Sequence, residues 1–575
     1  MDVRQLTPFI SVSPQINVAD IGLAASLGFR AIIANRPEKE GEDQPPNAEL
    51  EEACRINGLD WHYLPVVSGN ITGADVQAFA HLLATIQGPV LAFCRTGTRS
   101  TTLWALSEAH HLSVEAILKT ASAAGYDLSA QRDRLGSAAR QESTRPSAIV
   151  RHDVLIVGGG AGGQAVAASL LKRQPDLDIA IIEPNTLHYY QPGWTLVGGG
   201  VFERKDTVRN MASVMPDRVK WYQTAASLFL PEHQQVQLED GTALGYRTLV
   251  VAAGLSLNWQ GIKGLKETLG KNGVTSNYQF DLAPYTWELV QSTRCGKALF
   301  SQPPMPIKCA GAPQKAMYLS CDHWLRQGRL KDINVEFCTA GAALFGVADY
   351  VPALMKYVEK YGIQLNFQHN LIEVDGAARR ALFRITAPTG EVIEEEKPFD
   401  MLHVCPPQQA PAFIRNSPLA DAAGWVDVDT QTLKHKRHGD IFALGDCANS
   451  PNAKTAAAVR KQAPVVAENV LMALQGQAAR AIYDGYGSCP LTVERGKIVL
   501  AEFGYGGKLL PSFPTWLLEG REPSRLSWLL KEKMLPWLYW EAMLKGREWL
   551  AAPQLLEHSP ASHSSQQACD FGERK

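Results

Sequence analysis

The sequence predicts an α/β protein built from several domains. The chain has 575 residues, more than one compact domain usually holds, which corresponds to roughly three or four domains of ordinary size. Short apolar runs that suit buried strands alternate with helical patterns in two long regions. In one of them a glycine-rich turn stands between a strand and a helix, which is typical of folds with a parallel sheet.

Composition excludes several classes of protein. Hydrophobic residues make up 45% of the chain and charged residues 20%, which are ordinary values for a globular protein. Lys and Arg number 56 against 58 Asp and Glu, a net charge of -2, so nothing at whole-chain level favours a nucleic-acid partner. The first residues lack the basic start and apolar stretch of a signal peptide, and the ten cysteines are irregularly spaced. We therefore expect a cytoplasmic protein without a disulfide framework.

Composition also predicts where the domains end. The stretch after Tyr126 is polar, rich in Ser, Arg and Gln and without a period, which suits a linker. The last residues are polar and irregular, which suits a disordered tail. The predicted parts are a first α/β domain (1–125), a linker (126–149), a main α/β region (150–500), an amphipathic aromatic segment (501–555) and a tail (556–575).

The strongest motif is the turn GGGAGG at residues 158–163, which follows the strand HDVLIVG and opens a helix. In such a G-x-G-x-x-G turn Gly158 permits the tight turn, Gly160 lets the backbone approach a pyrophosphate and Gly163 lets the helix pack on the strand. Glu183 ends the next strand, about 20 residues further on, where an acidic side chain accepts from a ribose hydroxyl. The pattern predicts a bound dinucleotide rather than a tight turn alone.

Two later segments indicate which dinucleotide is bound. YRTLVVAAG (246–254) and DIFALGDCA (440–448) resemble the later motifs of flavoproteins with two dinucleotide-binding domains. The resemblance implies two Rossmann-like domains and FAD, with Asp446 holding the ribityl chain. Such proteins usually carry a second glycine-rich loop for NAD(P)H midway, but here the strand KALFSQPP is followed by KCAGAPQK. The electron donor is therefore predicted not to be NADH.

Cys309 stands where that nicotinamide loop would lie. Pro313 favours a first helical turn, and the residues after it have a helical period. The sulfur of Cys309 is thus expected near a helix N-terminus, between Lys308 and Lys315, and both features favour the thiolate. An ordinary small core residue is the alternative interpretation.

Four further segments are distinctive: EPNTLHYYQPGWTLVGGG, PIKCAGAPQKAMYLS, GDCANSPNAKTAAAV and YDGYGSCPL. With them, residues 150–550 resemble the sulfide:quinone oxidoreductases, most closely their mitochondrial-type (type II) branch. The resemblance implies that Cys309 and Cys489 form the redox pair. It assigns contacts with FAD to Ala161, Gly162, Glu183, Gln191, Ala226 and Lys454.

The resemblance also implies a reaction. Hydrosulfide attacks a disulfide or sulfur-bridged pair between the two cysteines and leaves a persulfide on one and a thiolate on the other. Two electrons then pass through FAD to a quinone, and a small nucleophile removes the outer sulfur. A thiol or sulfite could serve as that acceptor, and glutathione is the one we expect. Cys405 and Cys447 are additional redox candidates, although buried free cysteines are common.

The N-terminal region contains a second reactive-cysteine motif. The strand VLAF ends at Cys94, and the loop RTGTRS leads into a helix, which predicts an anion cradle with charge added by Arg95 and Arg99. With TPFISVSPQINVADIGLAASLGFRAIIANRP this region resembles bacterial phosphatase-like domains that are also fused to metallo-β-lactamase-like sulfur enzymes. The loop is one residue shorter than a Cys-x5-Arg phosphatase loop, and Ser68 stands where such phosphatases place an acid. The short loop instead resembles that of rhodaneses. This resemblance implies sulfur transfer through Cys94 rather than phosphatase activity or passive anion binding.

The C-terminal segment is unusually aromatic. Five of the thirteen tryptophans lie between Trp516 and Trp549. We predict two short amphipathic helices separated at Pro536, neither long enough to span a bilayer. Trp and Leu on one face with Lys and Arg on the other favour peripheral attachment to a membrane surface, whereas a dimer interface or packing on the core is the alternative.

Two other functions remain alternatives at this point. The same fold could serve a type II NADH:quinone oxidoreductase, and the N-terminal domain could bind a persulfide without turnover or act as a phosphatase. No cysteine and histidine cluster has the spacing of a metal site, so no metal is expected. The sequence leaves a homodimer open.

Overall fold

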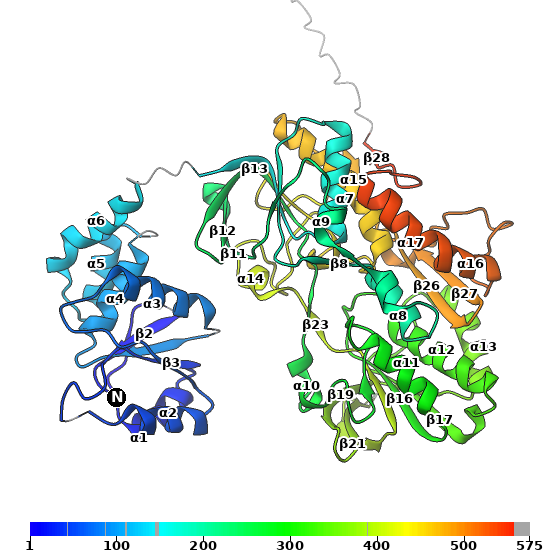
Figure 1. Ribbon diagram of the computed structural model, residues 1–575, viewed down its shortest axis with the longest axis horizontal. Helices are drawn as coiled ribbons and strands as arrows, with labels where there is room; N and C mark the ends of the chain where they lie inside the picture. The colour runs from blue at the N-terminus through cyan, green and yellow to red at the C-terminus, as the bar shows by residue number, and fades with distance from the viewer. Residues whose placement is uncertain are drawn as a thin grey trace, which may run out of the picture. The chain divides into compact units, whose positions relative to one another are not determined.

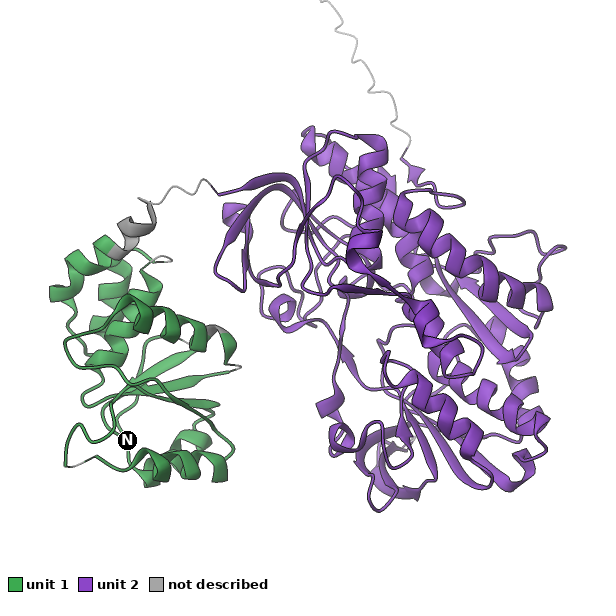
Figure 2. Ribbon diagram, in the orientation of Figure 1, with its two compact units in different colours: residues 1–148 green, residues 149–575 purple. Residues whose placement is uncertain are grey.

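The computed structural model describes residues 1–7, 9–42, 44–86, 88–109, 112–143, 149–387 and 389–556. The chain forms two compact units, residues 1–148 and 149–575 (Figure 2). The predicted tail from residue 557 on lies outside the described residues.

The first unit is a five-stranded sheet covered by helices (Figure 1). Its strand order is β1-β2-β5-β3-β4, in which only the pairing of β1 with β2 is antiparallel. The strands are β1 (Arg4–Gln5), β2 (Ile10–Ser13), β3 (Ala31–Ala34), β4 (Asp60–Tyr63) and β5 (Val90–Phe93). The helices are α1 (Val18–Ser26), α2 (Asn47–Ile56), α3 (Gly73–Thr85), α4 (Thr98–Glu108), α5 (Val114–Ala123) and α6 (Arg132–Ser143).

Both faces of this sheet are buried along its central strands β2, β5 and β3, and β3 and β5 are accordingly apolar throughout. Alternate residues of β3 enter two different cores: Ala31 and Ile33 join one, and Ile32 and Ala34 the other. Part of the stretch expected to be a linker also belongs to this unit. Residues 132–143 are helical and Leu135 is fully buried, because an apolar residue within the polar sequence reaches the core. Residues 144–148 of that linker lie outside the described residues.

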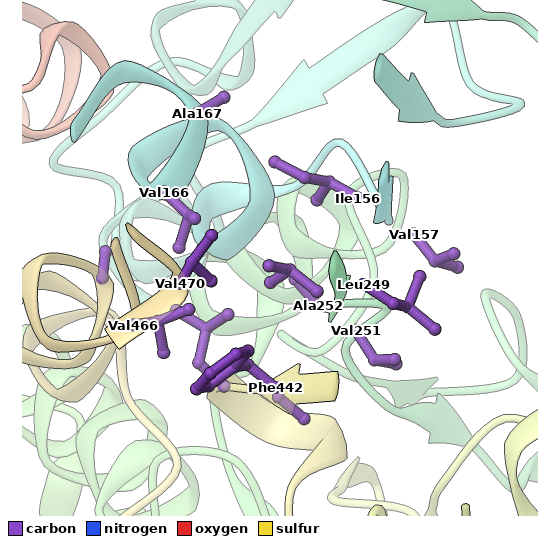
Figure 3. Packing of buried hydrophobic residues seen from close by; sticks show 14 of the residues in the cluster. Ile156, Val157, Val166, Ala167, Leu249, Val251, Ala252, Phe442, Val466 and Val470 are labelled. Atoms are coloured by element: carbon purple, nitrogen blue, oxygen red, sulfur yellow. The ribbon is translucent and has the colours of Figure 1, made fainter. Parts of the chain in front are cut away.

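The second unit begins with a mainly parallel sheet. Its order is β10-β7-β6-β13-β12-β11, and β24 pairs with β13. The strands are β6 (Arg151–Val157), β7 (Ile179–Ile182), β10 (Lys220–Tyr222), β11 (Ala226–Leu230), β12 (Gln235–Leu238), β13 (Ala243–Val251) and β24 (Ile441–Ala443). Helices α7 (Ala161–Arg173) and α15 (Ala456–Leu474) pack together over it, where Val166, Val466 and Val470 meet strand residues such as Phe442 (Figure 3).

A second parallel sheet lies in the same unit, in the order β15-β22-β16-β17-β18. Its strands are β15 (Val274–Thr275), β16 (Gly296–Gln302), β17 (Ile333–Thr339), β18 (Gln364–Phe367) and β22 (Met401–Val404). Helices α11 (Ala283–Ser292), α12 (Ala312–Arg326) and α13 (Val351–Tyr361) accompany it, as does an antiparallel sheet of β19 (His369–Asp375), β20 (Arg380–Thr386) and β21 (Val392–Pro398). The predicted α/β fold with two Rossmann-like domains and a further N-terminal domain is confirmed.

Shorter elements connect these sheets. They are β8 (Leu187–Tyr189), α8 (Trp194–Val197), β9 (Val208–Asn210), α9 (Met211–Val214), β14 (Ser256–Leu257), α10 (Leu265–Thr268), β23 (Gln408–Gln409), α14 (Ala412–Arg415), β25 (Ala481–Ile482) and β28 (Gln554–Leu555).

A hairpin and a helical run complete the second unit. The hairpin consists of β26 (Gly487–Glu494) and β27 (Lys497–Phe503), so the boundary expected at residue 500 falls inside a strand. The run comprises α16 (Arg525–Leu529), a π-helical turn over 530–534, α17 (Leu535–Trp537) and a second π-helical turn over 538–542. It continues through Pro536 instead of breaking there, because the wider turns on either side accommodate the ring.

Within the described part of the chain, no helix combines the length and apolar character needed to cross a bilayer.

Candidate active site

A cavity of about 600 Å³ lies within the second unit. Its walls come from the turn before α7, the loop before α12, the start of α15, the β26–β27 hairpin and the C-terminal helical run. The predicted residues on its wall are Gly158, Gly160, Ala161, Gly162, Glu183, Gln191, Cys309, Asp446 and Lys454. The fold therefore gathers most of the predicted site into one cavity.

The glycine turn has the geometry that a dinucleotide requires. Gly158 has a φ of +104°, and a Cβ on Gly163 would lie 1.9 Å from the Gly158 carbonyl oxygen. Gly160 is different, since a Cβ there would meet nothing within 4 Å. It is the N-cap of α7 and no side chain caps that helix, so the first N–H groups of α7 face the open cavity. Such a helix N-terminus is suited to a phosphate.

Glu183 lies at the end of β7 and is 8% exposed. One carboxylate oxygen accepts from the Gly159 N–H at 2.9 Å, and the other accepts from the Asn185 N–H at 2.8 Å. These contacts fix the carboxylate on the cavity wall, where its remaining lone pairs can accept from a ribose hydroxyl. Together with the free N–H groups of α7, it fits a dinucleotide.

Asp446 and Lys454 lie on the wall of the same cavity. Burial raises the pKa of Asp446 despite the neighbouring Lys454 and Lys308, and burial lowers the pKa of Lys454. The Lys454 ammonium donates to the carbonyl oxygens of Asp446 and Ala448, both at 2.8 Å. Lys454 therefore ties the loop after β24 to the start of α15.

Gln191 and Ala226 have different positions. Gln191 is on the cavity wall and accepts from Lys308 Nζ at 2.5 Å. Ala226 is buried in β11 and does not belong to the described wall of the cavity, so the structure does not bring it to the other predicted contacts.

Cys309 occupies a constrained position in the loop between β16 and α12. It has a φ of +51°, and its N–H donates to the Lys454 carbonyl oxygen at 2.8 Å. Lys315, in the first turn of α12, donates to the Cys309 sulfur at 3.0 Å. Hydrogen bonding from the Cys489 thiol, followed by the charge of Lys315, holds the pKa of Cys309 well below its ordinary value. Cys309 therefore has the electrostatic character of a nucleophilic thiolate.

Cys489 is fully buried on β26 and hydrogen-bonds to Cys309, which raises its own pKa well above the ordinary value. Cys405 and Cys447 are buried as well, and burial raises the pKa of their thiols to about 12 and about 11. In the described part of the chain Cys309 is the cysteine whose pKa is displaced downward. This separates it from Cys405 and Cys447.

Lys531 was missed by the sequence analysis. It comes from the π-helical turn after α16, is 3% exposed, and donates to the Pro192 carbonyl oxygen at 3.2 Å. Burial and the neighbouring Lys315 lower its pKa to about 7, whereas the two cysteines oppose that shift. A second amine, protonated below about pH 7, therefore lies near the sulfur pair. Only its place inside an apolar run, WLLKEKML, could have indicated that it is buried.

The first unit holds a separate site at Cys94. This cysteine is 1% exposed, and its sulfur accepts from the Gly97 N–H at 3.2 Å. Gly97 has a φ of +86°, and a Cβ there would lie 1.9 Å from the Tyr126 hydroxyl. Arg99 is buried and donates to the Glu40 carboxylate at 2.7 Å. This carboxylate offsets the positive charge that Arg99 was expected to add to the anion cradle at Cys94.

No group of three or more His, Cys, Asp or Glu side chains suited to a metal occurs within the described ranges.

Comparisons with known proteins divide the chain at the same place as the fold. Residues 2–111 match the family described as beta-lactamase hydrolase-like protein, phosphatase-like domain. Residues 152–285 match the pyridine nucleotide-disulphide oxidoreductase family.

The relatives differ for the two units. The mitochondrial sulfide:quinone oxidoreductase of Dictyostelium discoideum is 43% identical over 398 residues, 68% of this chain and 86% of the relative. The beta-lactamase hydrolase-like protein of Xylella fastidiosa is 39% identical over 108 residues, 19% of this chain and 25% of the relative. The solved sulfide:quinone oxidoreductase of Aquifex aeolicus shares the fold at 17% identity with a TM-score of 0.56, covering 69% of this chain and 92% of that one.

Proposed function

The chain belongs to the sulfide:quinone oxidoreductase family, and from that membership we propose that it binds FAD and uses Cys309 and Cys489 as its redox pair. The family match implies a flavin, with sulfide and a quinone as substrates. The observation that carries the proposal is Cys309 itself. Its sulfur lies on the wall of the dinucleotide cavity, beside Lys315 and next to the Cys489 thiol.

FAD fits the cavity by its chemistry and supplies the two-electron step. The N–H groups at the start of α7 would bind its pyrophosphate. Glu183 would accept a hydrogen bond from a ribose hydroxyl, and Asp446 would bind the ribityl chain. The chain's own residues hold the two sulfurs in place and favour the thiolate form of Cys309. Cys309 lies on the cavity wall, so it would be the thiolate beside the cofactor, and the buried Cys489 would carry the persulfide. Lys315 and Lys531 stabilise the negative sulfur and would attract hydrosulfide.

The test is an anaerobic titration of the full-length, flavin-loaded protein. Sulfide is expected to remove the visible flavin absorbance, and a soluble quinone should restore it. NADH serves as the comparison donor and is expected to leave the absorbance unchanged. If NADH reduces the flavin and sulfide does not, the protein is a dehydrogenase of the same fold.

The N-terminal unit is proposed to be a sulfurtransferase that passes sulfur through Cys94 to glutathione or a similar small thiol. The Gly97 N–H bonded to the sulfur and the start of α4 directly behind it favour an anionic sulfur. The missing acid at Ser68 counts against phosphatase chemistry, because a general acid assists an ester leaving group and sulfane sulfur needs none.

Cys94→Ser in the full-length protein is expected to lower thiosulfate-to-glutathione transfer by at least about 100-fold, since the nucleophile is lost. Sulfide-driven flavin reduction should remain at the wild-type rate. Cys54→Ala changes another buried cysteine of the same unit and is the control. Unchanged transfer in the Cys94 variant would instead favour a module that binds persulfide without turnover, or a phosphatase.

The C-terminal segment is proposed to attach the enzyme to a membrane surface, where a lipid-soluble quinone can reach the cavity. Large apolar side chains are exposed along it, including Trp516 at 83% and Leu529 at 53%. Trp516→Glu with Leu529→Glu should weaken co-sedimentation with anionic liposomes several-fold. Val392→Glu with Ile393→Glu, at exposed apolar positions on β21, should leave binding unchanged; equal losses in both pairs would mean that the segment is not the attachment site.

A further inference from the structure

The hairpin that carries Cys489 has two chemically different faces. In its antiparallel register Cys489 lies opposite Ala501, while Ser488 lies opposite Glu502. Because side chains alternate along a strand, neighbouring positions point to opposite faces. Cys489 and Ala501 pack in a hydrophobic core, whereas Ser488 and Glu502 are on the wall of the cavity. The redox sulfur and the Glu502 carboxylate therefore lie on opposite faces of one two-stranded wall.

Glu502 is the centre of a buried hydrogen-bonded cluster. It is 5% exposed, and one of its oxygens accepts from the Tyr486 and Ser512 hydroxyls, both at 2.5 Å. Its other oxygen accepts from the Ser512 N–H at 3.1 Å. The two hydroxyls are themselves 3.0 Å apart. Tyr486, Glu502 and Ser512 form a connected path for protons, and we refer to them as the carboxylate cluster.

A half-buried cation accompanies the cluster. Arg460 projects from the second turn of α15, and burial lowers its pKa while Tyr486 and Glu502 oppose that shift. Arg460 also donates to the Trp549 carbonyl oxygen at 2.6 Å. Burying the Glu502 carboxylate in a largely apolar cavity costs free energy, and an apolar residue in its place would avoid that cost. A charged group that is kept at this free-energy cost indicates that a molecule bound in the cavity interacts with it.

The surroundings of the cluster suit a quinone ring. Arg460 and all three members of the cluster are on the cavity wall, together with Phe513, Leu538 and Trp549. The rings of Trp537 and Trp549 stack at 5.3 Å between centroids, and these side chains are 44% and 53% exposed. A flat apolar ring with carbonyl oxygens matches this combination of apolar walls and a few polar groups. The exposed tryptophans would leave room for an apolar tail.

We propose that Tyr486 is the proton donor to the quinone. Glu502, Ser512 and Arg460 position its hydroxyl, and Glu502 and Ser512 return a proton to it after each turnover. This inference rests on the proposed sulfide:quinone reaction. Hydrogen sulfide and a thiol, RSH, together yield a persulfide, RSSH, with release of two electrons and two protons, and the quinone takes up two electrons and two protons. One proton leaves the Tyr486 hydroxyl, which turns from Glu502 to the quinone as the O–H bond forms on one quinone oxygen, and the other quinone oxygen takes the second proton from water. The phenolate regains a proton from water through Ser512 and Glu502, so Tyr486 is unchanged after each turnover.

Tyr486→Phe is the primary test, because it removes the O–H and keeps the ring. The two half-reactions are followed separately in the flavin-loaded protein. Flavin reduction by sulfide should stay within about twofold of wild type, whereas reoxidation by a short-chain soluble quinone should slow by about 100-fold, as expected for loss of a general acid. The variant should also lose the wild-type solvent deuterium effect on reoxidation.

Quinone binding gives an independent readout. Quenching of tryptophan fluorescence by the short-chain quinone reports on the cavity without turnover, since Trp537 and Trp549 are on its wall. Tyr486→Phe is expected to raise the Kd by about fivefold to tenfold, the effect of one lost hydrogen bond. Ser512→Ala, which makes a smaller change in the same cluster, should show a weaker form of both defects.

Tyr350→Phe is the matched control. The Tyr350 hydroxyl lies 3.0 Å from both the N and the O of the Glu502 main chain, and it does not contact the carboxylate. Its variant should reoxidise at the wild-type rate. Wild-type reoxidation in Tyr486→Phe would overturn the inference, as would an equal loss in Tyr350→Phe. Failure of sulfide to reduce the wild-type flavin would instead remove the proposed function.

Discussion

Cys309→Ser is expected to lower the rate of flavin reduction by sulfide by at least about 10³-fold, the size of effect seen when a nucleophile is removed. A serine hydroxyl stays protonated in this environment, so Lys315 has no anion to stabilise and Cys489 has no sulfur partner. The measurement is stopped-flow absorbance of the flavin-loaded protein under anaerobic conditions. Cys295→Ser is the control, since Cys295 is exposed and lies directly before β16. Sulfide reduction at the wild-type rate in the Cys309 variant would refute the redox pair.

The lowered pKa of Cys309 also predicts how the reactivity of its thiol depends on pH. A thiol with a depressed pKa is already ionised at neutral pH, so alkylation of reduced Cys309 by iodoacetamide should be nearly constant from about pH 7 to 9. Lys315→Met removes a cause of the depression, and alkylation should then rise with pH across this range. A steep rise already present in the wild type would mean that the thiolate is not stabilised.

Gly163→Ala is expected to abolish flavin binding and to destabilise the second unit. Its Cβ would lie 1.9 Å from the Gly158 carbonyl oxygen, so either α7 or the glycine turn must move. Strain and overpacking of this kind cost about 1–3 kcal/mol or more, and the displaced N–H groups no longer face the pyrophosphate. The measurements are the ratio of flavin to protein absorbance after purification and the thermal midpoint of the stripped protein.

Gly160→Ala separates cofactor contact from protein packing. Its Cβ would meet no protein atom within 4 Å, so the stripped protein should unfold at the wild-type temperature. The added methyl would nevertheless occupy the space into which the pyrophosphate fits, and flavin affinity should fall. If Gly163→Ala retained flavin as well as the wild type does, the proposed location of the dinucleotide would be wrong.

Features defined by local sequence were predictable. The strand, glycine turn and helix around residues 158–163 follow from short-range rules, and the structure has β6, the turn and α7 in that order. Cys309 could likewise be placed near a helix start from Pro313 and the helical period after it, because proline favours the first turn. Lys315 comes six residues after Cys309, less than two helical turns, so its long side chain can reach back to the Cys309 sulfur.

Features that depend on distant segments could not be predicted. Lys531 comes more than 200 residues after Cys309, and only the tertiary fold buries its amine near that sulfur. The carboxylate cluster depends on the register of β26 with β27 and on the loop that brings Ser512 back to Glu502. The continuous helix through Pro536 depends on π-helical turns, which have no reliable sequence signal. Ala226 was assigned by resemblance, and no local pattern shows whether a strand residue reaches a cavity.

The main-chain hydrogen bond from Cys309 to Lys454 has a consequence for motion. Cys309 follows a strand of the second parallel sheet, whereas Lys454 precedes the helix that covers the first. Lys454 is in turn held by two carbonyl oxygens of its own loop. A hinge opening between the two Rossmann-like halves would break these bonds and separate the sulfur from the cofactor pocket. Substrates are therefore expected to enter and leave the cavity while the halves stay closed, so turnover should proceed without a large domain movement.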